Sequence, residues 1–329
     1  MNPATGRVLV DCAGAWMGGA LRLLSELDAH LARQPTSDVV VVGRNRSLTS
    51  TWLIRRERAA RYRRIIALNN AGFVATRGER WVLLRNLLHF LPAEEVAQLP
   101  GGLPTTIIRQ APIVRACARK ADVVVVPTTL MADRVQQALP TLGSRIVVRP
   151  HPLSRPPQSD PAVRDRYRFL CPVLFEPFKA MGQRLRNVAE AARKVSDLAE
   201  REVTVTVTAT DDEARREGLL DCSPLRFVGR LTPQQLVPLQ HSHGALLYPT
   251  KVESFGYPLA EARLAGIPVV ARGTAQSREV AGPVLVPYQH EDPDEIATAM
   301  HVALTADPPR ESANPFDPDE YFTWLLARG

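Results

Sequence analysis

The sequence predicts an α/β protein with two doubly wound parallel sheets in tandem, and three observations support this prediction. Short runs rich in valine and isoleucine alternate with longer amphipathic segments along the whole chain, the order expected where helices cover both faces of a parallel sheet. A proline-rich stretch without periodicity, residues 151–163, divides the chain near its middle. The length of 329 residues suffices for about two domains, each with a core of its own.

The first half contains five strand candidates, each a short β-branched run. Residues 18–34 follow the first run and carry apolar residues at helical spacing, and residues 129–139 are a second expected helix. The strand candidates are residues 7–12, 38–43, 64–69, 121–127 and 145–150.

The second half repeats this pattern, with helices expected at residues 179–200 and 233–241. The final segment, residues 316–329, has an N-cap aspartate and an aromatic and leucine face. We therefore expect domains of residues 1–155 and 156–315, with the terminal helix packed back on the first domain. Ligands are expected at the carboxyl ends of the strands, in the cleft between the sheets. The strand candidates are residues 168–175, 202–210, 225–229, 244–250, 266–272 and 282–287.

Composition excludes several classes of protein. Hydrophobic residues make up 45% and charged residues 23% of the chain, which excludes a disordered, collagen-like or disulfide-scaffold protein. No apolar run is long enough to span a membrane, and no basic segment precedes an apolar one at the start, so we expect a cytoplasmic protein. The four cysteines lie far apart without a C-x-x-C pair, and we expect them to be buried thiols.

Charge is distributed unevenly between the two halves. Residues 1–150 hold 21 Lys and Arg against 10 Asp and Glu, a net charge of +11, whereas the remainder holds 20 against 24, a net charge of −4. Within residues 52–66, six arginines fall between Arg55 and Arg64. We interpret this stretch as an arginine-rich helix that either contacts an anionic membrane surface or a phosphorylated acceptor, or is simply solvated. Nucleic acid is not an expected partner, because no aromatic platform accompanies the charge.

The most informative segment is residues 248–282, where a strand leads into a loop and then a helix. The helix is expected to begin near residues 256–258, because a proline suits the first helical turn. The loop then presents backbone N–H groups that we expect to be free, with the helix dipole behind them, which together form an anion site. The residues with these N–H groups are Ser254, Phe255, Gly256 and Tyr257.

Two glutamates flank this loop. Glu253 precedes the helix and Glu261 lies about one turn inside it, so both are expected to project toward the same cleft on either side of the phosphate-binding loop. A carboxylate accepts two hydrogen bonds from a vicinal diol. We therefore expect one glutamate to bind the hydroxyls of a sugar and the other to bind those of a ribose.

These residues resemble the donor-site signature of retaining glycosyltransferases with the two-domain GT-B fold, the family-4 type (glycosyl transferases group 1). The signature has two glutamates with seven residues between them around an S-F-G loop, here Glu253 and Glu261, and then an E-A-x-x-x-G-x-P-V-V run, here residues 261–270. The resemblance extends to residues 226–236 and 286–300 and covers the first half of the chain more loosely.

The resemblance implies two Rossmann-like sheets facing across a cleft and transfer of a sugar, with retention, from a nucleotide sugar (UDP more than GDP) to an acceptor held by the first domain. The acceptor would belong to bacterial natural-product or cell-envelope glycan synthesis. Neither a cofactor nor a metal is implied.

The resemblance also assigns roles to particular residues of the second half. Glu253 would bind the donor sugar, Glu261 the ribose and Lys179 the diphosphate, while Gly229 and Arg230 lie in the loop that contacts the base. The family's usual arginine before that lysine is missing between residues 171 and 178. Either Arg184 or Arg230 replaces it, or the diphosphate is neutralised more weakly.

Candidates in the first half are less specific. Gly18 and Gly19 resemble the family's glycine loop near the reaction centre, although a plain helix start explains them equally well. His89, with Asn86 three residues before it on the same expected helix face, is the candidate histidine beside the donor sugar, with His151 as second choice. A structural histidine is the alternative for both. A third candidate, a metal site at His241 and His243, is not expected, because no third ligand accompanies them.

Two other functions remain open. The first is a sugar-nucleotide epimerase, or a glycogen-phosphorylase-like enzyme, of the same fold. The second is a non-catalytic nucleotide-sugar-binding partner or sensor, which the missing arginine favours.

Overall fold

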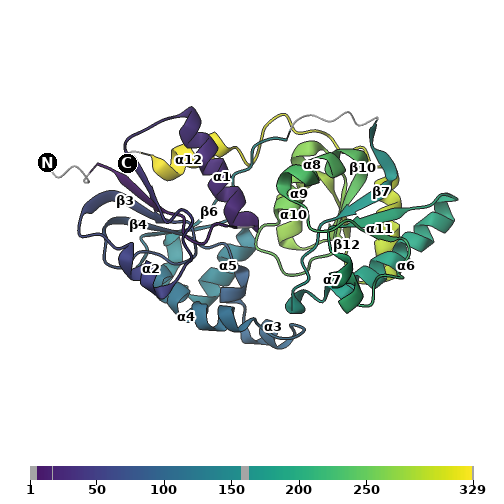
Figure 1. The fold of residues 1–329 in the computed structure, drawn as a ribbon, viewed down its shortest axis with the longest axis horizontal. Helices are drawn as coiled ribbons and strands as arrows, with labels where there is room; N and C mark the ends of the chain where they lie inside the picture. The colour runs from purple at the N-terminus through teal and green to yellow at the C-terminus, as the bar shows by residue number, and fades with distance from the viewer. Residues whose placement is uncertain (1–5, 17, 157–162, 328–329) are drawn as a thin grey trace. The chain divides into compact units, whose positions relative to one another are not determined.

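The computed structural model describes residues 6–16, 18–156 and 163–327. It contains two six-stranded sheets, and every strand pair in both is parallel (Figure 1). The predicted α/β class with two parallel sheets is therefore confirmed. Met17, next to the predicted glycine loop, and residues 157–162 of the proline-rich stretch lie outside the described residues.

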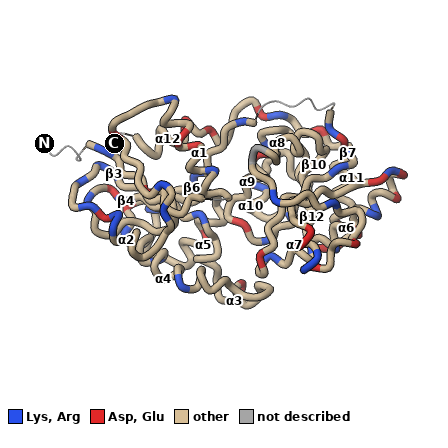
Figure 2. Tube along the Cα trace, viewed as in Figure 1, with Lys and Arg blue, Asp and Glu red and all other residues tan. Residues whose placement is uncertain are grey.

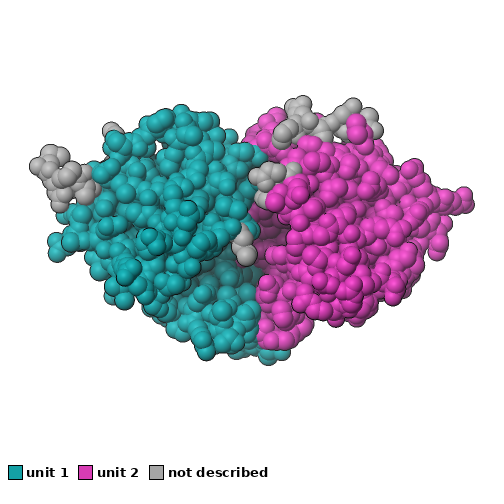
Figure 3. All heavy atoms as spheres, viewed as in Figure 1, with its two compact units in different colours: residues 1–97, 103–154, 315–329 teal, residues 98–102, 155–314 magenta. Residues whose placement is uncertain are grey.

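The chain divides into two compact units (Figure 3). Unit 1 comprises residues 1–97, 103–154 and 315–329, and unit 2 comprises residues 98–102 and 155–314. The short segment 98–102 packs with unit 2, which the sequence does not predict. A Cβ on Gly101 would lie 3.1 Å from the Cβ of Pro177.

The sheet of unit 1 has the strand order β2-β1-β3-β4-β5-β6. β4 escapes the sequence analysis because its first half carries three charged residues, while only its last three residues are fully buried. The strands are β1 (Val8–Asp11), β2 (Val39–Val42), β3 (Arg61–Ala67), β4 (Arg77–Leu83), β5 (Val123–Val126) and β6 (Ile146–Val148).

The helices of unit 1 correct two predictions. Residues 52–66 do not form one helix, since α2 ends at Arg55 and β3 begins at Arg61. The helix expected to contain Asn86 and His89 does not form either, because Leu83 ends β4 and only the short 3-10 helix η1 follows. The helices are α1 (Gly18–Arg33), α2 (Ser50–Arg55), η1 (Leu87–Phe90), α3 (Ala93–Ala97), α4 (Thr105–Lys120), α5 (Thr129–Ala138), η2 (Pro140–Arg145) and α12 (Pro318–Leu326).

The C-terminal helix α12 packs on unit 1. Its residues Tyr321, Phe322 and Leu325 belong to the same apolar cluster as Leu23 and Leu27 of α1. This contact places the aromatic and leucine face of the terminal segment in the core. A polar contact supports it at the surface, where the carboxylate of Asp319 lies 2.7 Å from Nδ1 of His30.

The sheet of unit 2 has the order β12-β11-β10-β7-β8-β9. The chain runs outward from β7 to β9 and returns to the other side of β7 as β10, so β7 and β10 meet at the topological switch point where open α/β sheets bind ligands. The strands are β7 (Asp165–Cys171), β8 (Thr204–Val207), β9 (Leu225–Phe227), β10 (His243–Tyr248), β11 (Val269–Arg272) and β12 (Leu285–Tyr288). The helices are η4 (Pro177–Lys179), α6 (Met181–Ala199), α7 (Asp211–Arg216), α8 (Pro233–Ser242), α9 (Tyr257–Ala265), α10 (Ala275–Ala281), η5 (Gly282–Val284) and α11 (Pro293–Thr305).

Two further properties of the described residues bear on the sequence analysis. None of their helices is long and apolar enough to cross a membrane. All four cysteines are free thiols, and three of them are buried.

Candidate functional site

The candidate site lies at the carboxyl ends of β7 and β10 in unit 2. The loop after β7 leads into η4, which ends at Lys179, and the loop after β10 leads through Glu253 into α9. These two segments are far apart in the sequence, and the parallel pairing of β7 with β10 brings them together at one edge of the sheet.

Glu253 is the centre of the contacts at this edge. Its Oε2 accepts a hydrogen bond from the Tyr248 hydroxyl at 2.8 Å and lies 3.8 Å from Nζ of Lys179. Its Oε1 accepts the backbone N–H of Ser254 at 3.0 Å. Both charged side chains keep access to solvent, at 25% exposure for Glu253 and 13% for Lys179. The structure thus brings Lys179 and Glu253 together, and it adds Tyr248.

The contact with Ser254 corrects one expectation. The Ser254 N–H is not free for an anion, because it donates to the adjacent carboxylate. Burial, together with the negative charge of Glu253, raises the pKa of Tyr248 well above its ordinary value. The phenol therefore stays protonated at neutral pH and acts as a donor to Glu253.

The loop before α9 requires a glycine. Gly256 precedes the first residue of α9 with φ +82°, and a Cβ there would lie 3.2 Å from Leu259 and 3.4 Å from Glu253. The buried amide of Gln276 donates to the carbonyl of Phe255 and fixes the loop from the other side. α9 therefore begins where the sequence predicts, at Tyr257.

Glu261 lies in the second turn of α9. Its Oε2 accepts a hydrogen bond at 3.1 Å from the amide of Gln240, a buried residue of α8. Gln240 therefore orients Glu261 much as Tyr248 orients Glu253. The sequence analysis missed both supporting residues, because neither an aromatic residue at the end of a strand nor an amide within a helix is a distinctive signal.

The two arginines expected to replace the missing one are both engaged in structural contacts. Arg184 is buried, donates to the carbonyl of Pro249 at 2.8 Å and lies 3.0 Å from the carboxylate of Glu291. Burial lowers its pKa. Arg230 donates to the carbonyl of Val173 at 2.7 Å and pairs with Glu213. Both arginines hold the loops that follow β7 and β10.

Gly229 lies next to Arg230 with φ +79°. Its N–H donates to the carbonyl of Ala209 at 2.9 Å. No atom lies within 4 Å of the place of a Cβ, so the surface above this glycine is open.

The histidine candidates lie in unit 1, and their surroundings differ from the prediction. Asn86 is the N-cap of η1, where its side chain accepts the Leu88 N–H at 3.0 Å, so it does not share a helix face with His89. His89 is 2% exposed, and burial lowers its pKa. His151 is likewise buried, and burial lowers its pKa to about 3. Both imidazoles are therefore neutral at physiological pH.

Gly18 opens α1 with φ +57°, and Gly19 is exposed beside it. His243 has both ring nitrogens engaged, with Thr206 and with the carbonyl of Leu239. No group of three or more His, Cys, Asp or Glu within the described residues could hold a metal ion.

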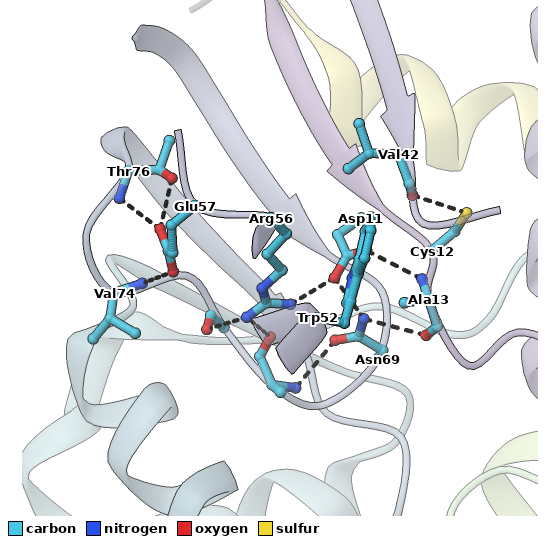
Figure 4. Close-up of polar contacts among 12 residues, drawn as sticks. Asp11, Cys12, Ala13, Val42, Trp52, Arg56, Glu57, Asn69, Val74 and Thr76 are labelled. Carbon is cyan, nitrogen blue, oxygen red and sulfur yellow. Dashed lines mark hydrogen bonds and ion pairs between the residues drawn. The ribbon is translucent and has the colours of Figure 1, made fainter. Parts of the chain in front are cut away.

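A buried polar network occupies the carboxyl ends of β1 and β3 in unit 1 (Figure 4). Asp11 is fully buried and accepts four hydrogen bonds, from Arg56 at 2.6 Å, Asn69 at 2.8 Å, Trp52 at 3.1 Å and the N–H of Ala13 at 3.1 Å. The sequence analysis missed it. The network joins α2, the end of β3 and the start of the β1–α1 loop.

This network also changes the interpretation of the arginine-rich stretch. Arg56 is 1% exposed and donates to the carbonyls of Ala71 and Gly72 as well as to Asp11. Arg64 is buried against Glu79, at 2.8 Å, and Arg63 donates to carbonyls at the end of α12. Three of the six arginines therefore stabilise unit 1 itself.

Comparison with known proteins supports the interpretation of unit 2. Residues 178–306 match the family model described as glycosyl transferases group 1, and this segment contains Lys179, Glu253 and Glu261. A search of the curated proteins finds no match to the sequence.

Solved structures resemble the chain over nearly its whole length. WaaG, a glycosyltransferase involved in lipopolysaccharide biosynthesis, is 14% identical with a TM-score of 0.67 over 98% of this chain and 100% of its own. Anabaena Alr3699/HepE, solved with UDP and glucose, is 14% identical with a TM-score of 0.58 over 97% and 95%. The UDP-GlcNAc 2-epimerase from Methanocaldococcus jannaschii is 11% identical with a TM-score of 0.54 over 97% and 98%.

At these identities the likeness establishes the fold. The chain has the GT-B fold, with two six-stranded parallel sheets, and its residues 178–306 match the glycosyl transferases group 1.

Proposed function

We propose that the protein is a glycosyltransferase that moves a sugar from a nucleotide-sugar donor to an acceptor. The observation that carries the proposal is the cluster of Lys179, Tyr248 and Glu253 at the switch point of unit 2, within the segment that matches the group 1 family model. A cation beside an oriented carboxylate suits a donor with a diphosphate on one side and sugar hydroxyls on the other.

In the proposed complex, Lys179 neutralises the leaving diphosphate and Glu253 accepts hydrogen bonds from the sugar hydroxyls. The two lone-pair directions of Glu253 that Tyr248 and Ser254 leave vacant are available for these bonds. Glu261 binds the ribose, and the loop at Gly229 and Arg230 contacts the base. The N-terminus of α9, with Phe255, Gly256 and Tyr257 before and at its start, adds the positive end of a helix dipole to the diphosphate site.

Transfer then proceeds with retention and without a metal. The acceptor hydroxyl attacks the anomeric carbon from the face that the diphosphate leaves, and its proton passes to the leaving diphosphate oxygen. The protein contributes position and charge stabilisation instead of a covalent nucleophile.

Unit 1 has the acceptor-binding role in this proposal, and Gly18, Gly19 and His89 are its candidate residues. The donor class is UDP-linked, since Anabaena Alr3699/HepE, of the same fold, was solved with UDP and glucose. The acceptor belongs to cell-envelope or natural-product glycan synthesis in a bacterial cytoplasm.

A binding screen tests the proposal. The protein is titrated calorimetrically with UDP, GDP, ADP, dTDP and their common sugar conjugates, and each conjugate that binds is then supplied with candidate acceptors. We expect one nucleotide and its sugar conjugate to bind, Lys179→Ala and Glu261→Ala to weaken binding of the free nucleotide, and Glu253→Ala to weaken only the sugar conjugate. The proposal fails if no nucleotide binds, or if all three variants bind like the wild type.

An epimerase is the second candidate function, since the chain also has the fold of the UDP-GlcNAc 2-epimerase. Incubation with a UDP-sugar and no acceptor distinguishes the two, because an epimerase produces the epimeric sugar nucleotide under these conditions and a transferase does not. A non-catalytic sensor, favoured by the missing arginine, binds the donor and produces neither product.

A further inference from the structure

Trp16, between β1 and α1 of unit 1, is the only exposed aromatic side chain among the residues that the structure describes. It is 49% exposed, whereas every other described tryptophan, tyrosine and phenylalanine is buried or half-buried. A tryptophan carries a large apolar surface, and an indole ring left half in water forgoes much of the free energy that its burial would provide. The ring is therefore available to a ligand that covers it.

The backbone that leads to Trp16 is held in place by hydrogen bonds. The N–H of Ala13 donates to the buried carboxylate of Asp11 at 3.1 Å (Figure 4), and the N–H of Gly14 donates to the carbonyl of Arg46 at 2.8 Å. The polar network around Asp11 in turn ties this backbone to α2 and to the end of β3. Because the backbone is already ordered, a ligand that covers the indole ring loses little affinity to ordering it.

A polar loop lies beside this backbone. The loop between β2 and α2, residues 43–49, contacts it through the hydrogen bond from Gly14 to the carbonyl of Arg46. Its residues Asn45, Arg46 and Ser47 are exposed. The loop contains two arginines and no acidic residue, and Figure 2 marks the charged residues along the chain. Amide, guanidinium and hydroxyl groups together both donate and accept hydrogen bonds.

We propose that Trp16 binds a sugar ring of the acceptor, with the hydroxyls of that ring hydrogen-bonded by the polar side chains of residues 43–49. One face of a pyranose ring consists of C–H bonds that lie flat on an indole, while the hydroxyls project from its edge and need polar partners. A lipid chain would cover the indole but would leave the polar side chains of the loop without hydrogen bonds. A carbohydrate uses both kinds of contact.

The position of Trp16 in the sheet agrees with this proposal. Open α/β sheets bind ligands outside the carboxyl ends of their strands, where the strand order reverses, and in unit 1 this point lies between β1 and β3. The buried contacts of Asp11 fill the interior there. A ligand is therefore expected on the outer surface, where Trp16 follows the end of β1.

This inference rests on the proposed function in one respect, because it assigns the bound ring to the acceptor. It narrows the acceptor to a carbohydrate, and it adds Trp16 to the candidate residues of unit 1. Binding of a glycan is measured without a nucleotide. A failure of this inference can therefore be told apart from a failure of the proposed function, which the nucleotide titrations reveal.

Binding of the full chain to an array of immobilised bacterial glycans tests the proposal, followed by titration with the soluble glycan that binds most strongly. We expect the wild type to bind a subset of the array. Trp16→Leu should weaken binding by about five- to tenfold, because leucine is apolar but has no flat ring. Trp16→Phe keeps an aromatic face and should retain most of the affinity.

Acrylamide quenching of tryptophan fluorescence reports on the indole itself. Trp16 is the most exposed of the four tryptophans, so acrylamide should quench its emission most strongly. A saturating concentration of the glycan should reduce the quenching of the wild type. Trp16→Phe should abolish this reduction, because the three remaining tryptophans lie away from the bound ring.

A variant in unit 2 is the matched control. Leu198→Ala removes an apolar side chain that is 69% exposed, and it should bind the glycan like the wild type. Both Trp16 variants should bind UDP like the wild type, and circular dichroism verifies that every variant is folded.

Three outcomes overturn the proposal. The first is no binding of the wild-type chain to any glycan of the array. The second is wild-type affinity of Trp16→Leu, or an equal loss in Trp16→Leu and Trp16→Phe, since either result shows that the ring face is not the contact. The third is an equal loss in Trp16→Leu and Leu198→Ala, which indicates nonspecific adsorption through exposed apolar side chains.

Discussion

Replacing Tyr248 with phenylalanine tests the hydrogen bond that orients Glu253 without removing the Glu253 carboxylate. The change removes one hydroxyl that donates to Oε2 of Glu253 at 2.8 Å, and the buried ring stays in place. Two contacts of the carboxylate survive, the N–H of Ser254 at 3.0 Å and the ammonium of Lys179 at 3.8 Å. The variant therefore leaves Glu253 charged and partly held, but no longer fixed in one orientation.

The magnitude follows from the type of bond. A hydrogen bond to a charged group contributes about 1.5–3 kcal/mol, a factor of roughly 10 to 150 in an equilibrium constant. The Glu253 side chain is 25% exposed, so water replaces part of the lost interaction. We therefore expect the affinity for a UDP-sugar to fall by a factor near the lower limit, about tenfold. Only ligands that contain the sugar should lose affinity, because Glu253 binds the sugar in the proposed complex.

Calorimetric titration with a UDP-sugar and with UDP alone measures this difference. Tyr248→Phe should weaken binding of the UDP-sugar and leave UDP unchanged. Tyr288→Phe is the control, because Tyr288 is a second buried phenol, at the end of β12, whose pKa is likewise raised by burial. Equal effects of the two variants, or equal weakening of UDP and UDP-sugar, would refute the idea that Tyr248 orients Glu253 for the sugar.

Three further predictions concern stability and are measured by urea denaturation. Gly256→Ala should lower the free energy of unfolding by about 1–2 kcal/mol because of the left-handed backbone, and by more because the new Cβ contacts Leu259. Gly229→Ala, where the Cβ position is open, should show the backbone effect alone. Equal losses of stability in the two variants would contradict the steric argument. Asp11→Ala leaves Arg56 buried without its charge partner and should cost about 3–5 kcal/mol, so a loss below about 1 kcal/mol would show that the pair is solvated. For Glu57, burial acts to raise the pKa, but hydrogen bonds from Thr76 and from backbone N–H groups outweigh it and lower the pKa. Its contribution is therefore present above the unfolded-state pKa and lost as pH falls through the folded-state pKa, and Glu57→Gln should flatten the acid limb of stability against pH; an unchanged acid limb would contradict this.

The sequence predicts the fold well because burial on both faces leaves a direct signature. Short apolar or β-branched runs mark eleven of the twelve strands that the structure describes, and the exception, β4, begins with the charged residues Arg77, Glu79 and Arg80 at its exposed end. The prediction of one helix over the arginine-rich residues 52–66 is wrong for the opposite reason. The composition of this stretch indicates a solvated surface, but Arg56 and Arg64 donate hydrogen bonds to carboxylates and carbonyls of residues that are distant in sequence.

Contacts between residues that are distant in sequence also limit what can be predicted of the candidate site. The motif predicts Glu253 and Glu261, and the resemblance to the family predicts Lys179. The residues that orient the carboxylates, Tyr248 and Gln240, are recognisable only from geometry, because an aromatic residue in a strand and an amide in a helix are ordinary there. Arg184 and Arg230 are candidates from sequence, because a guanidinium suits a diphosphate. In the structure they instead donate to the carbonyls of Pro249 and Val173.

The strand order reverses once in each sheet, but the residues at the two switch points differ, and this difference favours unit 2 as the unit that binds the nucleotide in the proposed function. In unit 1 the strand order reverses between β1 and β3, and there the buried Asp11 accepts hydrogen bonds from the buried side chains of Arg56 and Asn69. A ligand entering at that position would have to separate a buried ion pair, at a cost of several kcal/mol. In unit 2 the reversal between β7 and β10 has Lys179 and Glu253 3.8 Å apart and partly exposed, a pair that a charged ligand separates at little cost. The same fold therefore has one closed and one open switch point, and the open one is in unit 2.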